Sequence, residues 1–246
     1  MNKSEVIAIE IALWIIIIYA LVYEPVIGYF DYKKFKTRVK EHQNARINYY
    51  INTIASLWAP TLFILFIVFF TELTLKQIGI AAPAIQTEPF GPFAAYLAIG
   101  IGALYLLAIL YTIIGCHVNG TFKEKLSQAI KKEQAKNDFS IILPTTKKEA
   151  KLWNAVSLTA GITEEIIYRG FLIFALSYLF PSLSIWIIIL IASLLFGLAH
   201  TYQGTAGVIR TTIAGIFFSI LYVSLGSILP LIVLHFFIDY MNQLGN

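Results

Sequence analysis

The chain has 246 residues, of which 58% are hydrophobic and only 13% are charged, and its mean hydropathy is +0.75. Because soluble domains carry about 25% charged residues, this composition excludes an ordinary soluble globular protein. A single cysteine, Cys116, excludes an internal disulfide and a cysteine-rich metal site. The net charge of +4 gathers between apolar segments, which indicates membrane topology rather than nucleic-acid binding.

The N-terminal part of the chain predicts three membrane spans, each near the roughly 20 apolar residues that cross a bilayer. We place them at about residues 5–24, 50–70 and 93–116. The start of the first span carries Glu5 and Glu10, and no small-residue cleavage site follows it. We therefore expect an uncleaved span that ends near Pro25, not a signal peptide.

Two connecting segments are rich in basic residues. Residues 31–49 hold six Lys and Arg, and residues 117–149 hold seven Lys, with a helical character over 122–137. The connection 72–92 has no basic excess. Since basic loops stay in the cytoplasm, we expect residues 31–49 and 117–150 to be cytoplasmic loops of the cell membrane, with the N-terminus outside.

The composition changes beyond Lys151. Residues 152–246 contain five charged side chains and two histidines in otherwise apolar sequence. Candidate helices lie at about 151–180, 184–201, 206–223 and 229–243. The sequence therefore predicts an all-α, polytopic transmembrane helix bundle of about seven spans. It forms a single membrane domain over 1–246, with three N-terminal spans in 1–150 and a catalytic core of four helices in 151–246.

Charged groups inside a membrane are costly unless they are paired, and they usually mark function. Glu165 and Arg169 are four residues apart, so they share a helix face and can form an ion pair. Glu164 lies about 100° around the helix and lacks that partner. Such a carboxylate can act as a general acid or base, whereas the simpler alternative makes all three residues members of a structural ion-pair network.

Two further helices carry histidine. His200 ends an apolar helix, where a capping role is the simpler alternative to catalysis. His235 and Asp239 share a helix face, so the carboxylate could orient the imidazole or merely satisfy it. The three sets lie on three different apolar helices, and together they favour a catalytic site.

The motifs Glu164-Glu165…Arg169, Phe196…His200 and His235…Asp239 resemble those of the CAAX protease and bacteriocin-processing (CPBP, or Abi) membrane endopeptidases. The order and the internal spacing match over about residues 150–243. The resemblance implies peptide-bond hydrolysis in or beside the bilayer. It also implies that Glu164 activates water with His200, that His235 and residue 239 stabilise the oxyanion, and that Glu165 and Arg169 support the site.

The sequence leaves the metal question open. Glu164, His200 and His235 could bind zinc with an open position, although no His-Glu-x-x-His signature is present. Asp239 replaces the Asn of the prenyl-protein members, and an ionised Asp cannot donate a hydrogen bond. It must therefore be protonated, orient His235 or bind a metal.

The depth of His235 poses a geometric question. His235 follows Leu229 by only six residues, or roughly 9 Å of helix, whereas Glu164 and His200 are expected nearer the cytoplasmic side. For these side chains to meet, the connection 226–230 must lie inside the protein, or the last helix must be short and tilted.

We interpret the chain as an intramembrane endopeptidase acting on a peptide or protein near the lipid bilayer, with bacteriocin processing or self-immunity as roles implied by the resemblance. A non-catalytic immunity or scaffold protein and a proton-coupled transporter are the alternatives. A transporter more often shows internal repeats, and we find none in this sequence.

Overall fold

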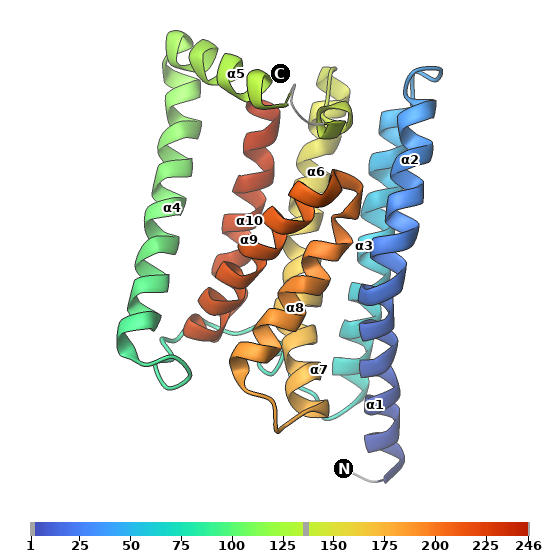
Figure 1. Ribbon diagram of the computed structural model, residues 1–246, viewed down its shortest axis with the longest axis vertical. Coiled ribbons are helices and arrows are strands. Elements are labelled where there is room, and N and C mark those ends of the chain that lie inside the picture. The colour runs from blue at the N-terminus through green and yellow to red at the C-terminus, as the bar shows by residue number, and fades with distance from the viewer. Residues whose placement is uncertain (1–2, 135–137, 246) are drawn as a thin grey trace.

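The computed structural model describes residues 3–134 and 138–245, and this part of the chain folds into a bundle of helices (Figure 1). Four helical stretches are long and apolar enough to cross a membrane: Ile9–Arg38, Ala45–Phe70, Pro92–Val118 and Thr201–Leu225. Shorter apolar helices accompany them at Ile185–Ala199 and Leu229–Leu244. The predicted polytopic helical membrane bundle is confirmed, although four segments of the described chain, not seven, meet the span criteria by themselves.

The first helix is longer than predicted. It runs as α1 (Lys3–Ile18), the π-helix η1 (Tyr19–Gly28) and α2 (Tyr29–Arg38), so the prediction of a loop from residue 31 is wrong as far as Arg38. The π-helix contains Pro25, and its wider turn accommodates a residue that lacks a backbone N–H. Beyond it, Tyr32 and Phe35 are buried on one face, and their packing favours continued helix.

The two basic segments lie at the same end of the bundle (Figure 1). α2 ends there and α3 (Ala45–Phe70) begins there; α4 (Pro92–Val118) reaches the same end and is followed by α5 (Gly120–Gln134) and the 3₁₀ turn η2 (Asp138–Ile142). The predicted helix over 122–137 is thus present as far as Gln134, and residues 135–137 lie outside the described residues.

The C-terminal part begins with one long helical run. α6 (Lys147–Glu164), the π-helix η3 (Glu165–Phe171) and α7 (Leu172–Leu179) follow one another without a break. A reciprocal capping box between Thr146 and Glu149 starts α6, because each side chain satisfies a backbone N–H that has no helical partner.

The remaining helices fold back on this run. They are α8 (Ile185–Ala199), η4 (Thr201–Gln203), α9 (Gly204–Leu225), α10 (Leu229–Met241) and η5 (Asn242–Gly245). α8 packs along α9, and α10 packs along α6. Gly161 permits the second approach, since a Cβ there would lie 3.1 Å from the backbone oxygen of Ile232.

The segment 71–91 bears on the depth at which His235 lies. It crosses the end of the bundle opposite the basic segments (Figure 1). It accepts a hydrogen bond from Ile228 N–H at Gly79 O (2.9 Å) and from the Ser227 hydroxyl at Ala81 O (2.6 Å). Ser227 and Ile228 are fully buried. Residues 227 and 228 of the α9–α10 connection are therefore buried, the first of the two alternatives, and α10 is also short, at 13 residues.

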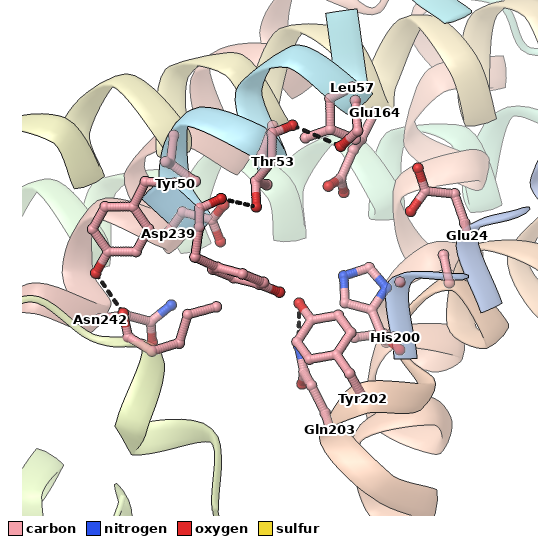
Figure 2. A pocket seen from close by; sticks show the side chains of 18 of the residues that line it. Glu24, Tyr50, Thr53, Leu57, Glu164, His200, Tyr202, Gln203, Asp239 and Asn242 are labelled. Atoms are coloured by element: carbon pink, nitrogen blue, oxygen red, sulfur yellow. Dashed lines mark hydrogen bonds between the residues drawn. The ribbon is translucent and has the colours of Figure 1, made fainter. Parts of the chain in front are cut away.

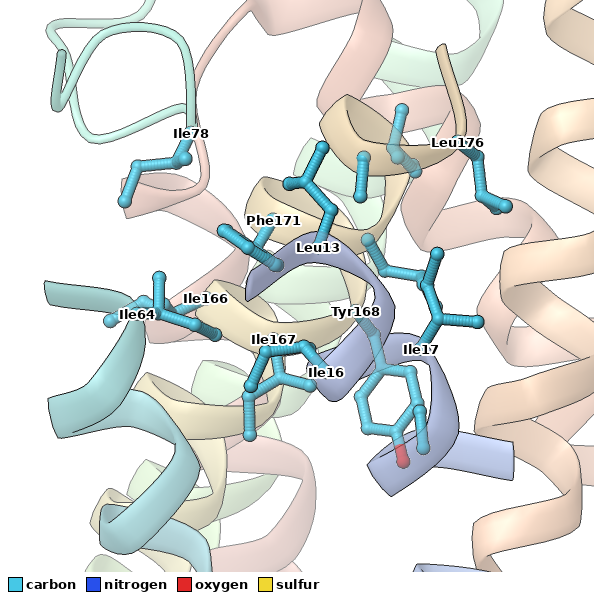
Figure 3. Packing of buried hydrophobic residues seen from close by; sticks show 14 of the residues in the cluster. Leu13, Ile16, Ile17, Ile64, Ile78, Ile166, Ile167, Tyr168, Phe171 and Leu176 are labelled. Atoms are coloured by element: carbon cyan, nitrogen blue, oxygen red, sulfur yellow. The ribbon is translucent and has the colours of Figure 1, made fainter. Parts of the chain in front are cut away.

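The main core joins the first helix to η3. Leu13, Ile16 and Ile17 of α1 pack with Ile167 and Phe171 in one buried cluster (Figure 3). Burial of large side chains of this kind is worth about 1.5–3 kcal/mol each where water is the alternative. In a bilayer the gain comes chiefly from close packing. The cluster fixes the position of the acidic motif against the N-terminal half of the chain.

Candidate active site

Glu165 is the centre of a buried charged network. Its Oε1 accepts hydrogen bonds from Arg169 Nη1 at 3.0 Å and from His235 Nδ1 at 2.7 Å. Glu165 is fully buried and Arg169 is 1% exposed. The Arg169 guanidinium also lies 4.0 Å from the centre of the Phe196 ring, a favourable cation–π arrangement. This network links η3, α8 and α10, the three elements that carry the motifs.

The hydrogen bond that orients His235 is donated to Glu165 and not to Asp239. His235 Nε2 lies 3.8 Å from Glu164 Oε2 and 3.8 Å from Asp239 Oδ2, too far for a direct hydrogen bond to either. Because an ionised carboxylate only accepts, the proton on Nδ1 faces Glu165. The other ring nitrogen therefore faces two carboxylates from different helices.

His200 is held by the backbone of its own helix. Its Nδ1 lies 2.8 Å from the carbonyl oxygen of Phe196. A carbonyl only accepts, so Nδ1 donates, and Nε2 of the neutral ring is left as a hydrogen-bond acceptor. His200 is the C-cap of α8 and precedes the turn η4, and its ring lies 4.8 Å from the Phe196 ring and 5.8 Å from the Tyr202 ring between centroids.

A cavity of about 1380 Å³ brings these groups together. All six predicted site residues line it: Glu164, Glu165, Arg169, His200, His235 and Asp239. Figure 2 shows Glu164, His200 and Asp239 around one space. The lining continues to Arg38 and His42 at the basic end of the bundle. Since Glu164 is 14% exposed in its side chain and Asp239 is 28% exposed, both carboxylates are accessible from the cavity.

The sequence interpretation missed Glu24. This residue lies on η1 and also lines the cavity, where its carboxylate points into the space shared with Glu164 and His200 (Figure 2). The Tyr19 hydroxyl donates a hydrogen bond to Glu24 Oε1. An acidic residue at the end of an apolar span was the available signal, but the adjacent Pro25 made it read as a span boundary.

The donor set does not fit the zinc alternative. Among the described residues, no group of three or more His, Cys, Asp or Glu side chains is arranged to hold a metal ion. Nδ1 of His235 is bonded to Glu165 and Nδ1 of His200 to a carbonyl oxygen, which leaves only Nε2 of each ring as a possible ligand atom. The three candidate ligands Glu164, His200 and His235 share the cavity but are not arranged as a coordination site.

The comparisons with known proteins concern the C-terminal part of the chain. The family model described as Type II CAAX prenyl endopeptidase Rce1-like matches residues 147–241. The predicted family is confirmed over these residues. The searches of curated proteins and of solved structures found no significant match. The CAAX endopeptidase match extends from α6 to α10 and indicates a membrane protease of the CAAX type. It includes all six predicted site residues, whereas Glu24 lies outside it.

Proposed function

We propose that the chain is an intramembrane endopeptidase in which Glu164 is the general base. The observation that supports this is one cavity lined by Glu164 at the end of α6, His200 at the C-cap of α8 and His235 of α10. Its substrate is a peptide or protein tail that enters the cavity at the membrane.

The proposed reaction begins with water held between Glu164 and His200 Nε2. Glu164 takes a proton from the water, the water oxygen bonds to the carbonyl carbon, and the carbonyl electron pair moves to its oxygen. His235 acts as the imidazolium, with Nδ1–H on Glu165 and Asp239 beside Nε2, and its Nε2–H donates to that oxyanion. The oxyanion then collapses, the C–N bond breaks, and the proton held by Glu164 passes to the leaving amine. General acid–base catalysis of this kind contributes about 10²–10⁴-fold.

The test uses the purified full chain and membrane-anchored fluorogenic peptides. Glu164→Gln preserves the size of the side chain but cannot take the proton, so kcat is expected to fall by about 10²–10⁴-fold with unchanged membrane insertion. Glu10→Gln, the same substitution at an exposed residue of α1, is the matched control. Wild-type turnover by Glu164→Gln would disprove the mechanism, and a loss of activity with chelator would overturn the metal-free route.

A further inference from the structure

Glu24 is a carboxylate in the cavity wall without a cationic partner. Glu165 pairs with Arg169 and His235, and both Glu164 and Asp239 lie 3.8 Å from His235. Within the described chain, no Lys, Arg or His lies at ion-pair distance from Glu24. Its Oε1 accepts from Tyr19, and its Oε2 makes no hydrogen bond within the described chain.

A second polar group of the same wall also lacks a partner. The Tyr168 hydroxyl is buried, with the residue 2% exposed, and it makes no hydrogen bond within the described chain. Tyr168 lines the cavity from η3, beside the helix that carries Ile17 (Figure 3). Glu24 lines the same cavity from η1. Buried polar groups are nearly always satisfied, and the Tyr168 hydroxyl and Glu24 Oε2 give this wall hydrogen-bonding capacity that the described chain does not use.

We propose that Glu24 and Tyr168 form a subsite for a cationic side chain of the peptide substrate, preferentially lysine. The proposal rests on the peptide-hydrolysing function for the source of its ligand, but it concerns binding rather than bond cleavage. It assigns a specificity role to the first helix, which lies outside the family match.

An ammonium group has the chemistry that this wall lacks. It carries three N–H donors and no acceptor, and the wall offers a carboxylate oxygen and a phenol oxygen. A charge-assisted hydrogen bond to the carboxylate is roughly twice as strong as a neutral one. The ring of Tyr23 also lines the cavity and stacks on Tyr19 at 5.0 Å between centroids, and aromatic faces attract cations.

The experiment measures binding separately from cleavage. The Glu164→Gln variant of the full chain, in nanodiscs, is titrated with a series of labelled membrane-anchored peptides. Each peptide carries a single lysine at a different position, and its control carries norleucine at that position. Lysine at one position is expected to tighten Kd about tenfold, which corresponds to 1.4 kcal/mol. Adding Glu24→Gln, which still accepts the Tyr19 hydrogen bond, is expected to bring the lysine-to-norleucine ratio close to one.

Two further variants keep the test decisive. Glu88→Gln, at an exposed residue of the segment 71–91, is the matched control and retains the preference. Tyr168→Phe removes only the hydroxyl, and we expect it to reduce the lysine preference by a few-fold. This variant tests the subsite if Glu24→Gln fails to fold. A lysine preference that survives both Glu24→Gln and Tyr168→Phe, or no preference at any position in the parent variant, overturns the subsite. If the lysine preference is present but the wild-type chain cleaves none of these peptides, the hydrolytic function alone is disproved.

Discussion

Arg169 and Glu165 form a buried ion pair at the centre of the site. Both are buried, and Glu165 also holds His235. The spacing of four residues predicted the ion pair. It could not predict that Glu165, 70 residues away along the chain, would be the hydrogen-bond partner of His235, because that contact depends on how α10 packs against α6.

Removing either charge of the Arg169–Glu165 pair is expected to destabilise the protein. Arg169→Met leaves a buried carboxylate without its cation and is expected to destabilise the protein by about 3–5 kcal/mol. Glu165→Gln leaves a buried guanidinium and should have a similar effect. The double variant removes both charges, so its loss should be well below the sum. Thermal unfolding of the three purified variants measures this double-mutant cycle, and simple additivity would show that the pair does not act as a unit.

The properties of individual residues explain which site residues could be predicted from the sequence. Six of them stand out because ionisable groups are rare in apolar sequence and are spaced for one helix face. Glu24 did not stand out, because a single acid beside a proline at the end of a span has an ordinary explanation. Its meaning comes from the fold, which places it at the edge of the same space as His200 (Figure 2).

At the scale of elements, two π-helices border the cavity. η1 carries Glu24, and η3 carries Glu165, Tyr168 and Arg169. Single π turns are frequent at functional sites. Hydrophobic periodicity predicted the helices at these places but not the wider turns, because a π turn depends on packing against neighbours more than on local propensity. The same dependence explains why the first helix continues through Pro25.

Gly170 tests the packing of η3. A Cβ added there would lie 2.4 Å from the backbone oxygen of Ile78, which belongs to the segment 71–91. Because the clash involves backbone, Gly170→Ala is expected to destabilise the protein by about 1–3 kcal/mol. Gly100→Ala in α4 is the matched control, since its Cβ meets no atom within 4 Å. Equal unfolding temperatures for the two variants would contradict this account of the close approach.

At the scale of the whole molecule, the sequence predicted the bundle and the order of its helices well. Composition determines that much, because a chain this apolar must satisfy its backbone within helices. The sequence could not predict how residues 1–150 contribute to the site. The contributions of η1 and α3 to the cavity wall depend on tertiary packing that no local pattern in those residues reveals.

We propose that the basic end of the bundle faces the cytoplasm, and labelling can test it. In a Cys116→Ser background, Ala82→Cys is expected to react with a membrane-impermeant maleimide on intact cells, and Lys123→Cys only after permeabilisation. Both positions are exposed, on opposite ends of the bundle. The reverse pattern would place the basic segments outside and contradict the positive-inside rule for this chain.

The segment 71–91 has a consequence for how substrate would enter and leave the cavity. It lies across the end of the bundle opposite the basic segments and bonds to the α9–α10 connection. Within the described chain, none of its residues lines the cavity. The described lining of the cavity therefore does not extend to that face. If the chain hydrolyses peptides as proposed, we expect the substrate and both products to enter and leave on the basic half of the bundle, whereas a transported solute would need an opening at each end.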